Sequence, residues 1–160
     1  MLPFFGMVLS RQKFRDLILQ ILFSLLLFPE QGEDSCEILA SWNQIPQETS
    51  LEVFQIANKI LHAKHYLDHL IQEYSKNYTL DKINPMEKAI LYQAFFTLQN
   101  DLSLPPVIVI TEALRLSKRY ITKDVARFIN AVLDSYVKDT KNTKHNSPSI
   151  TQPLQGTITV

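Results

Sequence analysis

The stretch TKDVARFINAVLDSY, residues 122–136, carries the clearest periodic pattern of the chain. Its apolar side chains recur at i, i+3, i+4, i+7, i+8 and i+11, the spacing that places them on one face of an α-helix; they are Val125, Phe128, Ile129, Val132, Leu133 and Tyr136. Thr122 precedes the pattern and can accept a hydrogen bond from a free amide of the first turn. The stretch therefore predicts a helix that begins after Thr122 and ends at about Lys138.

The same helical period dominates the chain before this stretch. Asn84, Pro85 and Glu87 together predict a helix start, because the Asn and Glu side chains satisfy free amides and Pro has none. The segment LPPVIVIT, residues 104–111, has the β-branched residues of a buried strand. No partner strand is visible, however, so we interpret it as the start of a helix. The helices expected cover about residues 10–28, 35–42 with Ser35 as its cap, 50–74 as one uninterrupted helix, 84–99 and 106–120.

The composition bounds the domain organisation. With 160 residues, 46% of them hydrophobic, the chain can form one compact domain, which we place at residues 10–138. Residues 1–9, MLPFFGMVL, form an N-terminal extension that is either a packed arm or a segment without fixed structure. Residues 139–160 are polar and are predicted to be disordered. The fold class expected is an all-α helical bundle.

The charge is balanced overall but unevenly distributed. Acidic and basic residues number 16 each, so net charge excludes no class of partner. A basic cluster lies near the predicted turn at residues 120–122; it contains Arg115, Lys118, Arg119, Lys123 and Arg127. The single cysteine, Cys36, excludes an intramolecular disulfide and agrees with a reducing compartment.

The first predicted helix, SRQKFRDLILQILFSLLLFP at residues 10–29, also resembles an export signal. Its apolar run is too short to cross a bilayer. Asp16, Gln20 and Ser24 recur at spacing four and form a narrow polar stripe on an otherwise apolar helix. We therefore predict a buried helix of a soluble protein, with a signal peptide as the alternative.

The sequence offers little that would support catalysis. Phosphate-binding and nucleophile-elbow motifs are absent, and Cys36 lies in an acidic stretch that disfavours a thiolate. His62, His65 and His69 share one face of the predicted helix and could ligate a transition metal. A fourth ligand and a known spacing motif are missing, so we predict no metal site, no cofactor and no enzymatic activity.

Several ordered segments resemble one protein family. MEKAIL, LPPVIVITEALRLSKRY and TKDVARFINAVLD, together with RQKFRDLILQILFS near the N-terminus, are similar to the NusB family of transcription antitermination factors. The resemblance implies two small helical subdomains and no enzymatic activity. It also implies binding to boxA-like single-stranded RNA together with NusE, a ribosomal small-subunit protein. The complex would act on RNA polymerase in the cytoplasm, notably in ribosomal RNA operons.

The resemblance also implies site residues. The RNA-binding set is Arg11, Lys13, Arg15, Tyr120, Asp124, Arg127 and Phe128, and the residues that would meet NusE are Phe23 and Glu87. Basic side chains suit phosphates, aromatic rings suit unpaired bases, and a carboxylate can accept from a base amino group. Other readings stay open: the helix dipole alone favours Asp124, Phe128 lies on the apolar stripe, and Arg11 and Arg15 could be solvated charges.

The sequence departs from the family at a few positions. Phe23 stands where a Tyr is usual, and Ile121 and Ala131 stand where Gly is frequent, so Ile121 requires either a turn without a positive φ or some backbone strain. Two rival functions are considered. The helical domain also resembles the N-terminal part of ribosomal RNA cytosine methyltransferases, which need a further α/β domain. The other rival is a helical adaptor that binds only proteins.

Overall fold

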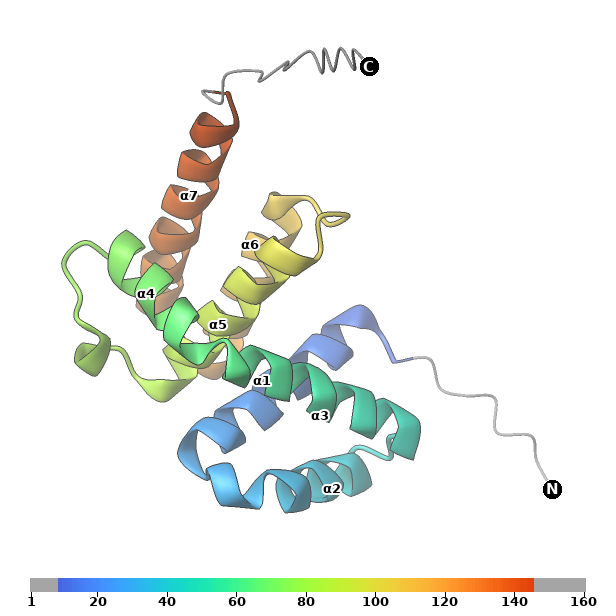
Figure 1. Ribbon diagram of the computed structural model, residues 1–160. Helices are drawn as coiled ribbons and strands as arrows, with labels where there is room; N and C mark the ends of the chain where they lie inside the picture. Colours follow the sequence, from blue (N-terminus) through green and yellow to red (C-terminus); the bar gives the residue numbers. More distant parts are fainter. Residues whose placement is uncertain (1–8, 146–160) are drawn as a thin grey trace, which may run out of the picture.

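The structure is a computed structural model, and it describes residues 9–145 (Figure 1). The described residues form helices and no β-strand, which confirms the all-α prediction, and LPPVIVIT contributes the start of a helix. The elements are α1 (Arg11–Leu27), η1 (Pro29–Gln31), α2 (Gly32–Trp42), α3 (Gln47–His62), α4 (Lys64–Tyr74), η2 (Leu80–Lys82), α5 (Pro85–Asn100), α6 (Pro106–Tyr120) and α7 (Lys123–His145), where η marks a short 3-10 helix.

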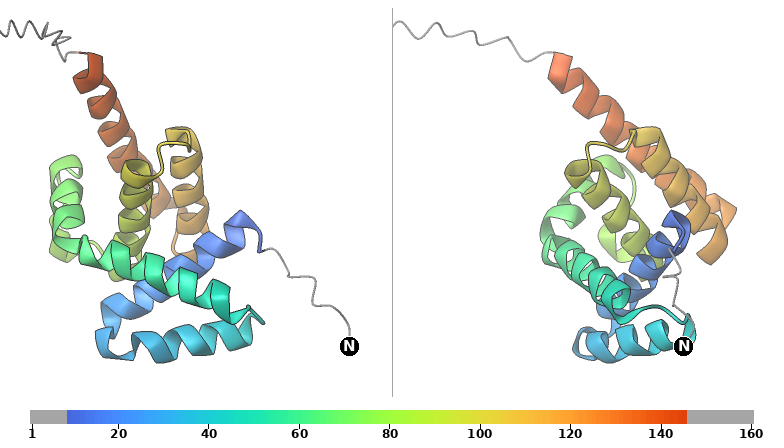
Figure 2. Two further views of the ribbon diagram at one scale, coloured as in Figure 1. Left: turned by 45° about the vertical axis from the view of Figure 1, so that its right-hand side comes forward. Right: turned by 90° about the vertical axis from the view of Figure 1, so that its right-hand side faces the viewer.

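The helices form two subdomains, as expected. Helices α1, α2 and α3 pack on one another, and α4, α5, α6 and α7 form the second group (Figures 1 and 2). Helix α1 also packs against α5, and this contact joins the two groups. No helix within residues 9–145 combines the length and the hydropathy that a bilayer span requires.

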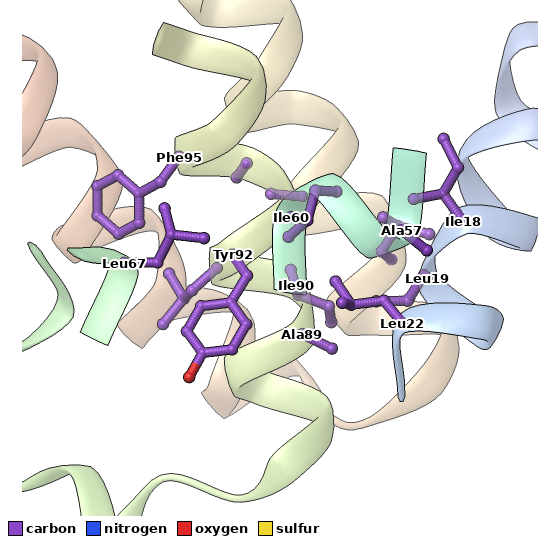
Figure 3. Close-up of a cluster of buried hydrophobic side chains, with 14 of the residues drawn as sticks. Ile18, Leu19, Leu22, Ala57, Ile60, Leu67, Ala89, Ile90, Tyr92 and Phe95 are labelled. Atoms are coloured by element: carbon purple, nitrogen blue, oxygen red, sulfur yellow. The ribbon is translucent and has the colours of Figure 1, made fainter. Parts of the chain in front are cut away.

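One hydrophobic core serves both subdomains. Leu22 of α1, Ile60 of α3, Leu67 of α4 and Ile90 of α5 lie in the same buried cluster (Figure 3). Each is at least 99% buried, and burying a side chain of this size contributes about 1.5–3 kcal/mol. The shared core fixes α1 relative to α5, which in turn positions α6.

Two predicted helix starts are confirmed in detail. The Glu87 amide donates to Asn84 Oδ1 at 2.9 Å, and Asn84 Nδ2 donates to Glu87 Oε1 at 2.9 Å. At the start of α7 the Val125 amide donates to Thr122 Oγ1 at 3.4 Å. Ile121, in the turn before it, has φ −130°, so the turn needs no left-handed residue.

The prediction of one helix from Ser50 to Tyr74 is wrong. Helix α3 begins earlier, at Gln47, and the chain breaks at Ala63, whose φ and ψ of −85° and 5° leave the helical region. The break changes the direction of the chain, because α3 packs against α1 whereas α4 packs against α5 and α7. Packing of α3 and α4 against different neighbours thus outweighs the continuous helical pattern of the sequence.

Two further boundaries differ from the prediction. Helix α2 begins at Gly32 rather than Ser35; the Ser35 hydroxyl instead bonds the Ser24 hydroxyl of α1 at 2.8 Å. Helix α7 continues to His145, so residues 139–145 of the expected tail are helical, and the Tyr74 hydroxyl donates to Asp139 Oδ2 at 2.7 Å. Residues 1–8 and 146–160 lie outside the described residues.

Candidate nucleic-acid interface

Two residues of the polar stripe of α1, Asp16 and Gln20, face α6. The Asp16 carboxylate is only 3% exposed, and it accepts from Arg115 Nη2 at 2.7 Å and from Arg119 Nη1 at 3.0 Å. One turn further along α1, Gln20 Nε2 donates to the Tyr120 hydroxyl at 2.9 Å. We call the contact formed by Asp16, Gln20, Arg115, Arg119 and Tyr120 the α1–α6 seam. It places the first turns of α1 beside the last turns of α6.

A second carboxylate extends the seam toward the start of α1. Glu112 of α6 lies 3.4 Å from Arg15 Nη1 and 3.0 Å from Arg115 Nη2. Burial lowers the pKa of the Arg115 guanidinium, but the hydrogen bonds to Asp16 and Glu112 outweigh it and raise the pKa above its ordinary value. The guanidinium groups of the seam are thus held in fixed orientations by carboxylates.

The three basic residues predicted at the start of α1 have different surroundings. Arg11 is exposed and has no ion-pair partner within residues 9–145. Lys13 Nζ donates to Asn43 Oδ1, beyond the end of α2, at 2.5 Å. Arg15 follows Lys13 by two residues and therefore lies on the other side of α1, where it points to Glu112 of α6. Arg11 is therefore the most available of the three for a phosphate.

The turn between α6 and α7 carries further positive charge. The Arg119 guanidinium carbon lies 5.5 Å from the centre of the Tyr120 ring, within the range of a cation–π contact. Lys118 and Lys123 flank this turn and are exposed. Sequence analysis recognised the basic cluster but did not include Arg115 or Arg119 among the site residues, because its pattern does not show which helix they face.

Three of the predicted residues line a second surface. Asp124, Arg127 and Phe128 lie across from the loop after α4, and together they enclose a groove of about 470 Å³ that we call the α7 groove. The Phe128 ring packs on Tyr78 with 4.6 Å between ring centres and an angle of 57° between ring planes. Phe128 is half-buried, so its ring both packs against Tyr78 and lines the α7 groove.

The polar residues of the α7 groove point to solvent. The side chains of Asp124 and Arg127 are 91% and 85% exposed, and their closest charged atoms are 3.8 Å apart. An exposed pair at this separation contributes at most about 1 kcal/mol, so both side chains are free to meet a ligand. Tyr78 was missed by sequence analysis, because it lies in a loop without periodic pattern and far from Phe128 in sequence.

The two residues expected to meet NusE are partly accessible. Phe23 of α1 is half-buried and packs against the core. Glu87 of α5 is half-buried as well; burial raises the pKa of its carboxyl group, partly offset by a backbone hydrogen bond from Asn84. Neither side chain is needed to complete the α1–α6 seam or the α7 groove.

The prediction that the three histidines lie on one helix is wrong. His62 ends α3, whereas His65 and His69 belong to α4 beyond the break at Ala63. His62 Nδ1 lies 2.7 Å from the Asn58 carbonyl oxygen, and within residues 9–145 no three His, Cys, Asp or Glu side chains gather as metal ligands. Cys36 is buried, with its sulfur 3.3 Å from the Ser50 carbonyl oxygen.

Comparison with known proteins gives one consistent family. The NusB family model matches residues 12–138. A transcription antitermination protein NusB from Methylacidiphilum infernorum is 31% identical over 134 residues, which cover 82% of this chain and 93% of that protein. Its counterpart from Dehalococcoides mccartyi strain CBDB1 is 30% identical over 139 residues, covering 85% of this chain and 97% of that protein.

Solved structures share the fold. T. maritima NusB superposes with a TM-score of 0.69 at 22% identity, covering 86% of this chain and 99% of that one. A structure of the antitermination factors NusB and NusE in complex with dsRNA gives a TM-score of 0.69 at 18% identity, covering 81% of this chain and 96% of that one. Both similarities concern the arrangement of the helices.

Proposed function

Because this chain belongs to the NusB family, we propose that it is a non-catalytic RNA-binding factor of transcription antitermination that acts in the cytoplasm. Its ligand is a boxA-type single-stranded RNA, which it binds together with NusE. The assembly acts on RNA polymerase, notably during transcription of ribosomal RNA operons. The antitermination proteins to which the chain is similar support this role, and the structure of NusB and NusE in complex with dsRNA supports NusE and RNA as partners.

The observation that carries the proposal is the α1–α6 seam. It packs the first turns of α1, which carry Arg11 and Arg15, against the last turns of α6, which carry Arg119 and Tyr120. Charges from two segments about 100 residues apart in sequence can therefore contact phosphates of one strand. Lys13, held by Asn43, contributes at the edge of this surface.

The α7 groove and Tyr120 of the α1–α6 seam supply the base-directed part of the proposed interface. Phe128 and Tyr120 offer rings on which unpaired bases can stack, and Asp124 can accept a hydrogen bond from a base amino group. Arg127 adds a phosphate contact beside them. With these roles the protein would prefer a single-stranded RNA, because the bases of a single strand are free to turn toward the protein.

NusE is proposed to bind near Phe23 and Glu87. Burial raises the pKa of the half-buried Glu87 carboxyl group, and a cationic donor from a partner would stabilise its charged form. Phe23 offers a partly exposed ring on the neighbouring helix.

A binding experiment tests the proposal. The full chain is titrated with a boxA-like RNA and with a scrambled RNA of the same composition, at several salt concentrations, with and without NusE. We expect preference for the boxA-like strand, affinity that falls with salt, and tighter binding when NusE is present. Absence of RNA binding, or equal affinity for both strands with NusE present, would instead indicate an adaptor that binds only proteins.

A further inference from the structure

Helix α2 exposes two large apolar side chains on its outer face. Trp42, the only tryptophan of the chain, is 80% exposed, and Ile38, one turn before it, is 51% exposed. Residues four apart on a helix are neighbours on one face, so the two side chains form one apolar patch. Large apolar side chains that are exposed next to each other, rather than singly, mark a contact surface for another molecule.

The packing of α2 explains why this patch is exposed. Buried Cys36, with its sulfur 3.3 Å from the Ser50 carbonyl oxygen of α3, lies on the opposite face of the helix from Ile38. Helix α2 packs on α1, η1 and α3, and Figures 1 and 2 show it on the side of α1 and α3 that is turned away from α6 and α7. The patch is therefore separate from the α1–α6 seam and from the α7 groove.

Carboxylates flank this patch. Asp34 lies one turn before Ile38 on the same face, and Glu37 is next to Ile38; both are exposed and have no ion-pair partner within residues 9–145. We call Asp34, Glu37, Ile38 and Trp42 the α2 face. Four further exposed carboxylates belong to η1, α2 and α3: Glu30, Glu33, Glu48 and Glu52. No Lys or Arg occurs from residue 30 to residue 58, so this region is uniformly negative.

The negative charge decides which kind of molecule fits the α2 face. A nucleic acid or an anionic membrane surface carries the same sign and would be repelled. A protein segment with apolar and basic side chains matches both properties, because it can cover the apolar patch and place its cations among the carboxylates. An amphipathic helix with a basic polar face has this chemistry, and the 11 residues of α2 offer it a surface about 17 Å long.

We propose that the α2 face docks a basic amphipathic helix of a partner protein. An apolar side chain of that helix packs on Trp42 and Ile38, and its Lys or Arg side chains pair with Asp34 and Glu37. This surface adds a protein contact to the proposed RNA and NusE surfaces, and it leaves the α1–α6 seam free for RNA.

The fluorescence of Trp42 tests the proposal in the full chain, because no other tryptophan contributes to it. The probe is a helical peptide made only of leucine and lysine, and the control peptide has glutamate in place of each lysine. We expect the lysine peptide to shift the emission to shorter wavelength, with an affinity that falls as salt increases, and the glutamate peptide to cause no shift. No RNA is present, so the result does not depend on the proposed function.

Three outcomes of this titration would overturn the proposal. The first is an unchanged emission with the lysine peptide, and the second is an equal shift with both peptides, which indicates apolar contact without charge recognition. The third is a shift caused by raising the concentration of the protein alone, which indicates that a second copy of the chain covers the α2 face.

Removal of the apolar anchor locates the peptide on the protein. Binding of a fluorescently labelled lysine peptide is followed by anisotropy, so that variants without tryptophan can be measured. Trp42→Ala should weaken binding by at least about tenfold, as expected for a central aromatic contact. Leu102→Ala, in the loop after α5, is the control, because Leu102 is also 80% exposed, and it should leave the affinity unchanged. Equal affinities of the two variants would contradict the proposal.

Removal of charge tests the electrostatic part in the same assay. Asp34→Asn/Glu37→Gln should weaken binding of the lysine peptide and reduce its dependence on salt. Glu73→Gln/Asp134→Asn removes two accessible carboxylates from α4 and α7 instead, and it should change neither quantity. Equal effects of the two double variants would show that the peptide responds only to the total charge of the protein, and the proposal would fail.

Discussion

The carboxylate of Asp16 and the guanidinium of Arg115 lie 2.7 Å apart, although 99 residues of sequence separate them. Asp16 belongs to the first subdomain and Arg115 to the second. The pair therefore does two things at once: it holds the subdomains together outside their apolar core, and it orients the basic side chains of the proposed RNA surface.

Replacing Asp16 should destabilise the fold. In Asp16→Asn, Arg119 loses its carboxylate partner and Arg115 keeps only Glu112, and we expect a loss of about 1–3 kcal/mol in the free energy of unfolding. The loss stays below the 3–5 kcal/mol of a fully buried pair because Arg119 reaches solvent. Urea unfolding measures it. Asp134→Asn, which breaks the exposed pair with Lys138, is the control and should change stability by less than about 0.5 kcal/mol; equal losses in both variants would contradict the assigned role.

Gly32 should resist even the smallest side chain. A Cβ at this position would overlap Cδ2 of Leu25, which is buried and cannot move freely. We expect Gly32→Ala to cost about 1–3 kcal/mol, against the gain that Ala normally brings to a helix. A double-mutant cycle with Leu25→Ala checks the cause, because removal of the Leu25 side chain should abolish most of the added cost of Gly32→Ala. Additive effects would point to a different origin.

Tyr92 should make stability depend on pH in the alkaline range. Its buried hydroxyl donates to Asp68, and burial together with this bond raises its pKa above the ordinary value near 10. The stabilisation is complete below pH 10 and is lost as the pH rises above it, by about 1.4 kcal/mol per pH unit. Urea midpoints between pH 8 and 12 should fall less steeply for Tyr92→Phe than for the parent chain. Parallel slopes would disprove the contribution of Tyr92.

Arg11 and Arg15 should differ in their effect on RNA binding. Arg11 has no carboxylate near it within residues 9–145, whereas Glu112 already lies 3.4 Å from Arg15. Arg11→Ala should reduce the slope of log affinity against log salt by about one unit, and Arg15→Ala by clearly less. Lys138→Ala, on the distal part of α7, should not change the slope. Slopes that fall equally for both arginine variants would show that Glu112 does not shield Arg15.

Asp124 should affect which RNA is bound rather than the stability of the protein. Its side chain is 91% exposed, so Asp124→Asn should change the free energy of unfolding by less than about 0.5 kcal/mol. The same change removes a carboxylate acceptor, and we expect the preference for the boxA-like over the scrambled strand to shift. Asp134→Asn on the same helix should leave the preference as it is. If Asp124→Asn leaves the preference between the two strands unchanged, the favourable interaction of an acidic side chain with the helix dipole at the start of α7 explains why Asp124 is there.

Local signals in the sequence predicted the helices well where the chain itself determines them. The start of α5 follows from Asn84 and Glu87, whose side chains bond within one turn. The break at Ala63 follows instead from packing: α3 and α4 bury their apolar faces on different neighbours. No Gly or Pro marks that break, so the periodic pattern runs across it.

The site could be predicted only in part for a similar reason. Asp16, Gln20 and Ser24 are recognisable as a polar stripe, but a stripe does not reveal which helix it faces. Only the folded chain shows that Arg115 and Arg119 meet Asp16, and that Tyr78 meets Phe128. Such contacts join segments far apart in sequence, and no local spacing encodes them.

The α1–α6 seam also determines which partner loses more conformational entropy when the protein binds RNA. Since Asp16 locks both helices before a ligand arrives, the backbone beneath the basic surface has little freedom left to lose. A flexible single strand must supply most of the ordering, so an RNA already constrained in the bound shape should gain affinity without any new contact to the protein.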